Sequence, residues 1–426
     1  MVIYVVQSGD SIFSIAQRFG TSSEEIISSN MLTQPESLVI GQTIVIPVDS
    51  FPYQLQRGET LYSLSQRFGI PLSELLDANP QITDPSNMAI GDTITIPSPP
   101  EKLRAILANG YAFPNIREEV LNDTLPYLSF LSPFSYQAND DGTLTPISDE
   151  RLISDAVSWY TLPIMVVTNI DSQDGFSGSI ANSIFSSNET RRLFIDNIIS
   201  TMQTKGYRGV DIDFEYLYPS DRESYNNFLR ELKSRLEPLG YSLNTALAPK
   251  ISADQPGILY EAHDYKTQGE IVDHIIIMTY EWGYTYGPPM AVSPINSVRQ
   301  VLDYAITEIP PEKILMGIPN YGYDWTLPYR PGTAAQTISN VGAVDLARKV
   351  GATIQYDEKS QAPYFFYYDN DGKQHVVWFE DARSIDAKLR LIDEYNLGGV
   401  SYWTINRFFP QNWLVQNALY NVEKFT

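Results

Sequence analysis

The strongest hydrophobic pattern in the chain is an alternation of apolar and acidic residues between Tyr207 and Tyr216. In a β-strand, successive side chains point to opposite faces. The alternation therefore separates an apolar face from a carboxylate face, which consist of Val210, Ile212 and Phe214 and of Asp211, Asp213 and Glu215. Because both flanking segments have buried character, we expect the carboxylates to point into a closed interior. The alternative is an exposed edge strand whose carboxylates lie in water.

Helical periodicity surrounds this strand on both sides. Apolar residues recur at three- and four-residue spacing before it, in 190–205, and after it, in 223–236. Further apolar segments predict strands separated by helices, at 104–109, 127–134, 163–168, 242–248, 274–280, 314–320 and 399–404. Eight strands that alternate with helices predict an α/β fold, the (β/α)8 TIM barrel. In that barrel, catalytic residues lie at the carboxyl ends of the strands.

The seventh and eighth predicted strands are separated by far more residues than one crossover helix needs. Short strand patterns occur at 353–356, 364–368 and 374–379, with a turn at 369–372. They predict a small α+β insertion over about 327–380. The many tyrosines of this insertion fit either one wall of a cleft or a separately packed subdomain.

Residues 1–97 contain an internal repeat. The segment 6–20 matches 55–69, and both copies end in Ile-Gly-x-Thr-Ile-x-Ile-Pro. Each copy has the pattern strand, helix, helix, strand. We therefore expect small domains at 1–48 and 51–98 and a barrel domain at 101–426, with a stiff linker at 98–100.

Composition narrows the possible functions. Hydrophobic residues make up 43% of the 426 residues, which supports large packed cores. The formal net charge of −22 argues against a nucleic-acid partner, which would require a basic face. The chain has no cysteine, and His263, His274 and His375 lack the spacing of metal ligands. We expect neither a metal nor a cofactor.

The amino-terminal segment Met1–Ser8 has no basic region and only a short apolar run. We therefore expect no cleavable signal peptide. No segment of the sequence reaches the roughly 18 apolar residues of a membrane helix, so we also expect no membrane span.

Three carboxylates on one buried strand face repel each other. Burial and like charge both disfavour the ionised form, so at least one carboxyl should stay protonated near neutral pH. A protonated carboxyl is the general acid that cleavage of a glycosidic bond requires. Glu215, nearest the carboxyl end of the strand, is the predicted general acid/base. Asp213 is the neighbour that holds its proton, and Asp211 lies deeper and tunes Asp213.

The run Gly209–Glu215 resembles the Asp-Gly-x-Asp-x-Asp-x-Glu signature of glycoside hydrolase family 18, the chitinase-like enzymes. Two departures are visible. Arg208 replaces the leading Asp of the signature, and Met165–Asn169 stands where the family has Ser-x-Gly-Gly. The resemblance implies a retaining reaction in which the 2-acetamido oxygen of the substrate, and no protein side chain, attacks C1.

The same resemblance implies roles for individual residues. Asp213 would orient the acetamido N–H, and Tyr280 would bind the acetamido carbonyl. Glu281, where the family usually has Asp, would contact the sugar. Trp403 would form the floor of the −1 subsite, the alternative being a core aromatic residue. Further candidates for sugar hydrogen bonds lie at the end of the seventh strand, namely Asn320 and Tyr321.

Both repeats resemble LysM domains, which bind chitin and peptidoglycan through N-acetylglucosamine. The resemblance rests on the Gly-Asp/Glu-Ser/Thr-Leu/Ile start and the terminal Ile-Pro. It implies a sugar groove between residues 9–11 and 32–40 in the first copy and between 58–60 and 82–90 in the second. The alternative is that the repeats serve only dimerisation or attachment to a protein.

LysM domains ahead of a family 18 barrel resemble the spore cortex-lytic N-acetylglucosaminidases of spore-forming bacteria. The resemblance implies a monomeric hydrolase of the spore cortex or coat. It would bind peptidoglycan and cleave β-1,4 bonds after N-acetylglucosamine in the cortex or its fragments. The alternatives are a chitinase acting on chitin oligomers and a chitinase-like lectin that binds sugar without cleaving it. The presence of Glu215 argues against the lectin.

Overall fold

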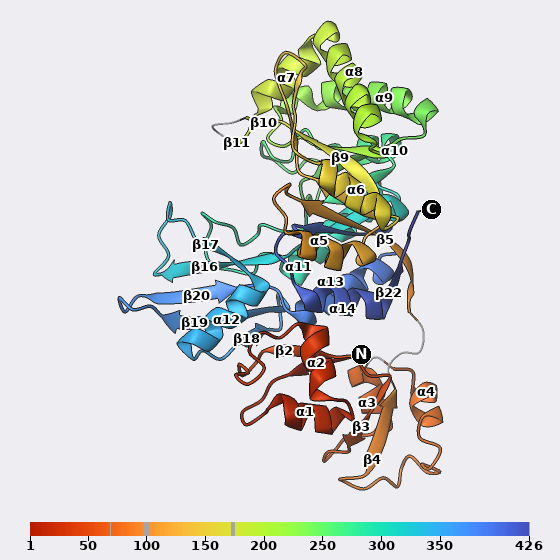
Figure 1. The fold of residues 1–426 in the computed structure, drawn as a ribbon, viewed down its shortest axis with the longest axis vertical. Coiled ribbons are helices and arrows are strands. Elements are labelled where there is room, and N and C mark those ends of the chain that lie inside the picture. The colour runs from red at the N-terminus through yellow and green to blue at the C-terminus, as the bar shows by residue number, and fades with distance from the viewer. Residues whose placement is uncertain (69, 98–101, 172–174, 426) are drawn as a thin grey trace.

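The computed structural model describes residues 1–68, 70–97, 102–171 and 175–425. The parts are arranged along one long axis, with the two amino-terminal modules at one end and the barrel towards the other (Figure 1). A separate sheet projects from the side of the barrel, next to the first module (Figure 1).

The two modules have the same order of elements. The first contains β1 Val2–Val5, α1 Ile12–Phe19, α2 Ser23–Asn30 and β2 Thr43–Ile46. The second contains β3 Ser50–Gln54, α3 Leu61–Phe68, α4 Leu72–Asp77 and β4 Thr93–Pro97. In each module the two strands pair antiparallel, β1 with β2 and β3 with β4. The predicted order of strand, helix, helix, strand is confirmed.

Eight parallel strands close into a barrel. In chain order they are β5 Arg104–Ala112, β6 Phe130–Pro133, β9 Leu162–Thr168, β12 Gly209–Asp213, β13 Ser242–Leu247, β14 His274–Ile277, β15 Ile314–Pro319 and β21 Gly399–Trp403. Each strand pairs with the next, and β21 returns to β5, which closes the ring. The predicted TIM barrel is confirmed.

Helices cover the outside of the barrel. They are α5 Glu118–Thr124, α6 Glu150–Ser158, α7 Gly178–Ser186, α8 Asn188–Lys205, α9 Arg222–Leu236, α10 Tyr265–Ile271, α11 Ile295–Glu308, α13 Ala382–Glu394 and α14 Pro410–Leu419. Short 3-10 helices are η1 Leu125–Tyr127, η2 Pro219–Asp221, η3 Glu237–Leu239 and η4 Pro311–Lys313. Minor strands are β7 Tyr136–Ala138, β8 Leu144–Thr145, β10 Ile170–Asp171, β11 Gly175–Phe176 and β22 Tyr420–Val422. Within the described ranges, no helix combines the length and hydropathy needed to cross a membrane.

The acidic strand β12 is buried on both faces. It pairs with β9 on one side and β13 on the other, so the alternative of an exposed edge strand is wrong. Its apolar side chains and that of the following Phe214 pack under the helices, where the ring of Phe214 stacks on that of Phe228 in α9 at a centroid distance of 6.3 Å. The carboxylates therefore face the barrel interior. The strand ends at Asp213, earlier than the alternation predicts.

The insertion after β15 forms a five-stranded antiparallel sheet covered by one helix. Its elements are β16 Tyr321–Leu327, β17 Gln336–Ser339, α12 Asn340–Val350, β18 Gln355–Asp357, β19 Ala362–Tyr368 and β20 Gln374–Trp378. The sheet begins at Tyr321, before the predicted start near 327, because β16 pairs with β20 directly after the barrel strand. A Cβ at Gly322 would lie 2.1 Å from the carbonyl oxygen of Trp378, so only glycine permits this approach.

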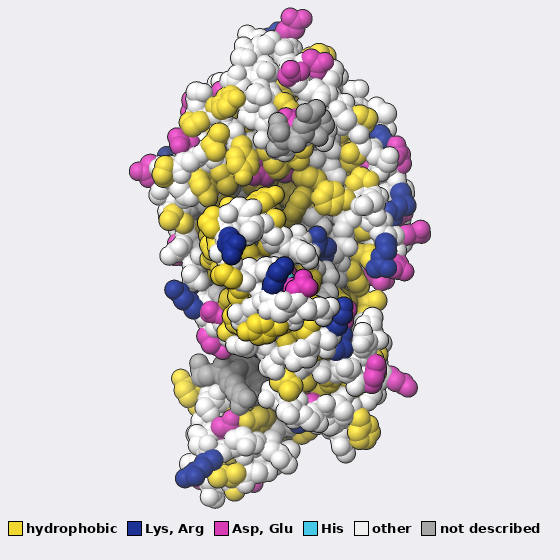
Figure 2. Space-filling model, turned by 90° about the vertical axis from the view of Figure 1, so that its left-hand side faces the viewer, with side chains coloured by type: hydrophobic (Ala, Val, Ile, Leu, Met, Phe, Trp, Pro, Cys, Tyr) yellow, Lys and Arg dark blue, Asp and Glu magenta, His cyan; other side chains and the backbone are white. Residues whose placement is uncertain are grey.

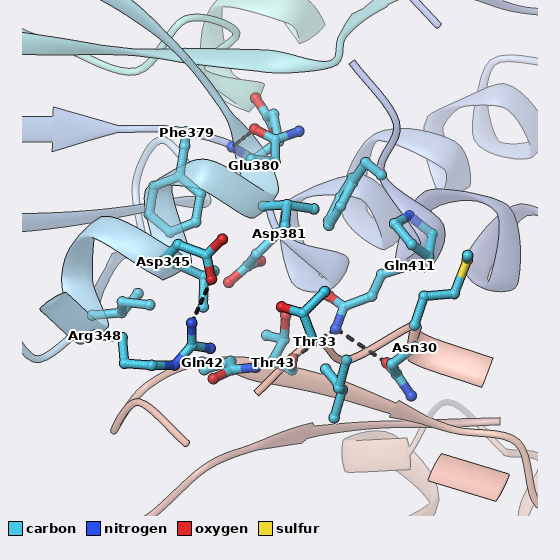
Figure 3. A pocket seen from close by; sticks show the side chains of 18 residues that line it. Asn30, Thr33, Gln42, Thr43, Asp345, Arg348, Phe379, Glu380, Asp381 and Gln411 are labelled. Atoms are coloured by element: carbon cyan, nitrogen blue, oxygen red, sulfur yellow. Dashed lines mark hydrogen bonds and ion pairs between the residues drawn. The ribbon is translucent and has the colours of Figure 1, made fainter. Parts of the chain in front are cut away.

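The first module is docked against both the barrel and the insertion. The side chain of Gln411 in α14 donates to the carbonyl oxygen of Thr43 (2.7 Å) and to Oδ1 of Asn30 (3.1 Å), as Figure 3 shows for Asn30. On the insertion side, the backbone N–H of Ile354 donates to the carbonyl of Ile40 at 2.9 Å. These bonds fix the first module relative to the catalytic domain.

A matched pair of glycines tests this docking. Gly41 and Gly91 occupy the same position in the two repeats and have φ values of +85° and +92°. A Cβ at Gly41 would lie 1.9 Å from the carbonyl oxygen of Ile354, whereas a Cβ at Gly91 would meet nothing within 4 Å. Replacement by Ala should cost backbone strain at both sites, about 1–2 kcal/mol. At Gly41 the clash should cost roughly 1–3 kcal/mol more. Thermal unfolding should show the larger drop in midpoint for Gly41→Ala, and equal drops would contradict the docking.

Candidate active site

A hollow of about 160 Å³ lies at the carboxyl ends of the barrel strands. Its acidic and sugar-site candidates are Asp213, Glu215, Tyr280, Glu281 and Trp403, and its other lining residues are mostly apolar. Figure 2 looks onto this side of the molecule and shows apolar side chains gathered around a hollow. The site therefore has apolar side chains around its rim and carboxylates at its bottom.

The two aspartates of β12 lie below the mouth. Asp211 is 1% exposed and accepts a hydrogen bond of 2.6 Å from the hydroxyl of Tyr111. Burial raises the pKa of Asp211 to about 7, against the opposing effect of this hydrogen bond. Burial, with the charges of Glu215 and Asp211, raises the pKa of Asp213 well above its ordinary value. Burial and mutual repulsion therefore favour the protonated form of these two carboxyls.

Glu215 lies two residues beyond the end of β12, where strand pairing has stopped. The side chain of Asn169, directly after β9, takes the place of the strand backbone that would otherwise pair with Glu215. Its Oδ1 accepts from the backbone N–H of Glu215 (2.9 Å), and its Nδ2 donates to the backbone carbonyl of Glu215 (2.8 Å). Burial and the charge of Glu281 raise the pKa of Glu215 to about 7. The backbone of Glu215 is thus held in place, and its carboxyl can give and take a proton near neutral pH. Sequence reasoning did not single out Asn169, although a polar residue after a barrel strand is a usable signal.

Tyr280 enters the hollow from the segment after β14. A Cβ on Gly317 of β15 would lie 2.7 Å from Cε1 of Tyr280, so the ring packs directly over this glycine. The pKa of Tyr280 is raised well above its ordinary value by burial and by the neighbouring carboxylates. The hydroxyl therefore stays protonated and is available as a hydrogen-bond donor.

Glu281 is a fourth carboxylate of the site, held by the insertion. Its backbone has a φ of 66°, and its carboxylate accepts hydrogen bonds from the hydroxyls of Tyr321 and Tyr323, the latter at 3.0 Å. Burial raises the pKa of Glu281, and these two hydrogen bonds lower it. Sequence reasoning missed Tyr323, although Tyr321, Tyr323 and Trp325 alternate along β16.

The Glu281→Gln variant should shift the pH dependence of hydrolysis. A general acid must be protonated, so activity is lost as pH rises through the pKa of Glu215, which is about 7. Removing the negative charge of Glu281 stabilises the Glu215 anion and lowers its pKa. The alkaline limb of kcat/KM should therefore move to lower pH in Glu281→Gln. A limb that stays in place would contradict the electrostatic link.

Trp403 closes the hollow at the end of β21. Its indole makes edge contacts with Phe134 at 4.7 Å and with Tyr111 at 5.4 Å between ring centroids. These rings hold the indole in one orientation while it remains half-buried at the hollow. A fixed, flat apolar surface beside carboxylates suits the apolar face of a pyranose ring.

Comparison with known proteins agrees with this geometry. The model for "Glycosyl hydrolases family 18" matches residues 164–407. The chain belongs to glycosyl hydrolases family 18. The LysM domain model matches residues 4–47 and 53–97, so the chain also carries two LysM domains. It is therefore a glycoside hydrolase with modules for glycans that contain N-acetylglucosamine.

Three relatives show how far this family 18 likeness extends. The cortical fragment-lytic enzyme of Bacillus subtilis (strain 168) is 46% identical, over 100% of both chains. The crystal structure of the Bacillus megaterium QM B1551 spore cortex-lytic enzyme SleL has a TM-score of 0.88 and 40% identity, covering 100% of this chain and 99% of that one. A chitinase from Chromobacterium violaceum ATCC 12472 has a TM-score of 0.69 and 25% identity, covering 74% and 98%.

Some of the predicted site residues line the hollow of the family 18 site, and the others lie beneath or behind these lining residues. Asp213, Glu215, Tyr280, Glu281 and Trp403 line the hollow together. Asp211 lies beneath, and Tyr321 behind Glu281. Asn320 is buried at the end of β15, and its backbone N–H donates to the carbonyl of Trp403 at 2.9 Å. Neither Asn320 nor Tyr321 lines the hollow.

Of the two departures from the family 18 pattern, Met165–Asn169 reaches the active site, because Asn169 bonds the backbone of Glu215, whereas Arg208 lies away from the reacting end. Arg208 precedes β12 and is exposed at the opposite end of the barrel, where its backbone bonds Pro163 and Ser242. Buried His263 bridges the backbone of Ala248 (2.9 Å) and Phe214 (3.0 Å). Burial lowers the pKa of His263 to about 4, so it is a neutral structural residue. Among the described residues, no group of three or more His, Asp or Glu side chains is placed to hold a metal ion.

Proposed function

We propose that this glycoside hydrolase is an N-acetylglucosaminidase of spore cortex peptidoglycan and its fragments, cleaving β-1,4 bonds after N-acetylglucosamine. The observation that carries the proposal is the set of three carboxyls on one strand face: Asp211 and Asp213 are buried, and Glu215 is half-buried at the barrel mouth. It belongs to a chain that matches a cortical fragment-lytic enzyme from end to end. The spore is accordingly the proposed location.

In the proposed reaction, Glu215 gives its proton to the glycosidic oxygen while the acetamido oxygen of the bound sugar attacks C1. Asp213 accepts a hydrogen bond from the acetamido N–H and stabilises the positive charge that develops there. Tyr280 donates to the acetamido oxygen. After the leaving group departs, Glu215 takes a proton from the attacking water, and the configuration at C1 is retained.

The protein groups around the sugar have separate tasks in this proposal. Trp403 supports the apolar face of the ring, and Glu281 accepts a hydrogen bond from a sugar hydroxyl. Tyr321 acts through Glu281 and is a positioning residue. Asn320 supports the backbone of Trp403 and is likewise a positioning residue. All these groups come from one chain, which supports a monomer as the working unit.

A chitinase remains the second candidate, because a chitinase structure matches 74% of the chain. The test is to digest purified cortex peptidoglycan and, separately, chitin oligomers, and to identify the released ends by mass spectrometry. The proposal expects new reducing N-acetylglucosamine ends from cortex. Release from chitin alone would assign a chitinase. Binding to either polymer without release would leave a lectin.

A further inference from the structure

The two LysM modules use the same loop in different ways. In the first module, residues 32–40 form the loop between α2 and β2, and this loop is pressed against the insertion. Arg348 in α12 donates through Nε to the carbonyl of Ser37 at 2.6 Å, and Ile354 donates to the carbonyl of Ile40. The glycine that follows the loop, Gly41, abuts Ile354.

The sequences of the two repeats differ at the docking positions. Val39 is 4% exposed and belongs to the same buried cluster as Ala343, Phe365 and Phe379 of the insertion. Val45 is 1% exposed and belongs to the barrel cluster. The equivalent residues of the second module are Ala89, which is exposed, and Thr95, which is half-buried. The first module thus carries apolar residues for docking that the second lacks.

The same loop of the second module, residues 82–90, is open to solvent. Ile90 is 68% exposed and Gly91 has free space around it. A hollow of about 320 Å³ lies along the loop, lined by Gln81, Ile82, Thr83, Asp84, Asn87, Met88, Asp92, Thr93 and Ile94. These positions correspond to the face by which the first module meets the catalytic domain (Figure 3).

Two aspartate side chains stabilise the conformation of this open loop by accepting hydrogen bonds from its backbone. Asp84 accepts from the backbone N–H of Ser86 at 2.9 Å, and Asp92 accepts from the backbone N–H of Ala89 at 2.7 Å. Amide and hydroxyl groups of Gln81, Thr83 and Asn87 lie beside the apolar Ile82 and Met88 in the lining. Neutral donors and acceptors beside an apolar surface match a sugar with hydroxyl and acetamido groups.

We infer that the LysM modules have divided tasks: the first is a fixed adapter joined to the catalytic domain through its groove loop, and the second captures a glycan that contains N-acetylglucosamine at the hollow along 81–94. Because α1 packs on β3, with Phe19 and Phe51 at 5.2 Å between ring centroids, the capturing module stands in a set position relative to the barrel. The inference rests on the proposed function, since it specifies where the substrate polymer is held.

Matched substitutions at Thr83 and Thr33 test the division, because these exposed threonines occupy the same repeat position. Both are made in the full chain carrying Glu215→Gln and Trp403→Ala, so that the substrate survives and the catalytic cleft contributes little. Co-sedimentation with cortex peptidoglycan and with chitin gives the affinity. Thr83→Trp should weaken binding about tenfold, and Thr33→Trp should leave it within about twofold.

A second variant guards against misfolding of the second module. Asn87→Ala only shortens an exposed side chain, and it should weaken binding several-fold with an unchanged thermal midpoint. Equal losses for Thr83→Trp and Thr33→Trp, or no loss for Thr83→Trp and Asn87→Ala, would overturn the division. Binding of the parent chain to chitin and not to cortex would count against the proposed function. In that case, the binding of the same variants to chitin would test whether the two modules have divided tasks.

Discussion

Glu215→Gln should lower kcat/KM on cortical fragments by about 10³-fold while leaving binding of the fragments intact. The amide has nearly the shape of the carboxyl, so the hydrogen bonds from Asn169 to the Glu215 backbone remain. It cannot deliver a proton to the glycosidic oxygen, and the leaving group must depart as an unprotonated alkoxide. Steady-state kinetics on soluble fragments, with titration calorimetry for binding, measures both quantities.

Glu189→Gln is the matched control for this experiment. Glu189 is exposed in the first turn of α8, and the same chemical change there should leave kcat/KM unaltered. If Glu215→Gln retained activity within about tenfold of the parent chain, Glu215 would not be the general acid.

Asp213→Asn should lower kcat by about 10²-fold with a smaller effect on KM. Asp213 is 5% exposed, so its carboxylate form, once the proton has left, acts in a site from which water is largely excluded. The positive charge on the acetamido group develops only as the substrate reacts, which is why the loss should fall on kcat. Kinetics of the single variants and of the double variant with Glu215→Gln provide the measurement.

The double variant distinguishes a shared step from separate roles. If Asp213 and Glu215 act on the same step, the double variant should be little worse than Glu215→Gln alone. Fully additive losses would mean that Asp213 acts elsewhere. A change in KM alone for Asp213→Asn would assign it to ground-state binding.

The barrel and its acidic strand could be predicted because their signals are local. A two-residue alternation fixes which side chains share a face, and apolar segments separated by helical periods fix the order of elements. The end of the acidic strand could not be predicted, because it depends on Asn169, a residue 46 positions earlier that takes over the backbone pairing of Glu215. Contacts between residues so far apart leave no periodic signal.

The insertion, and the contact between the first module and the catalytic domain, also depend on residues far apart in the sequence and were not fully predictable. The predicted strands of the insertion are present, but the capture of Glu281 by Tyr321 and Tyr323 follows from how β16 is placed against the barrel mouth. The docking of the first module had a signal in the sequence. Val39 and Val45 differ from Ala89 and Thr95 in an otherwise similar repeat. Only the structure shows what these valines pack against.

The most direct measurement is the anomeric configuration of the first product. Proton NMR during early hydrolysis of cortical fragments records the new reducing N-acetylglucosamine before mutarotation mixes its anomers. The β-anomer should appear first, because attack by the acetamido oxygen followed by water retains the configuration at C1. Appearance of the α-anomer first would mean direct attack by water, and would contradict the reaction assigned to Asp213 and Glu215.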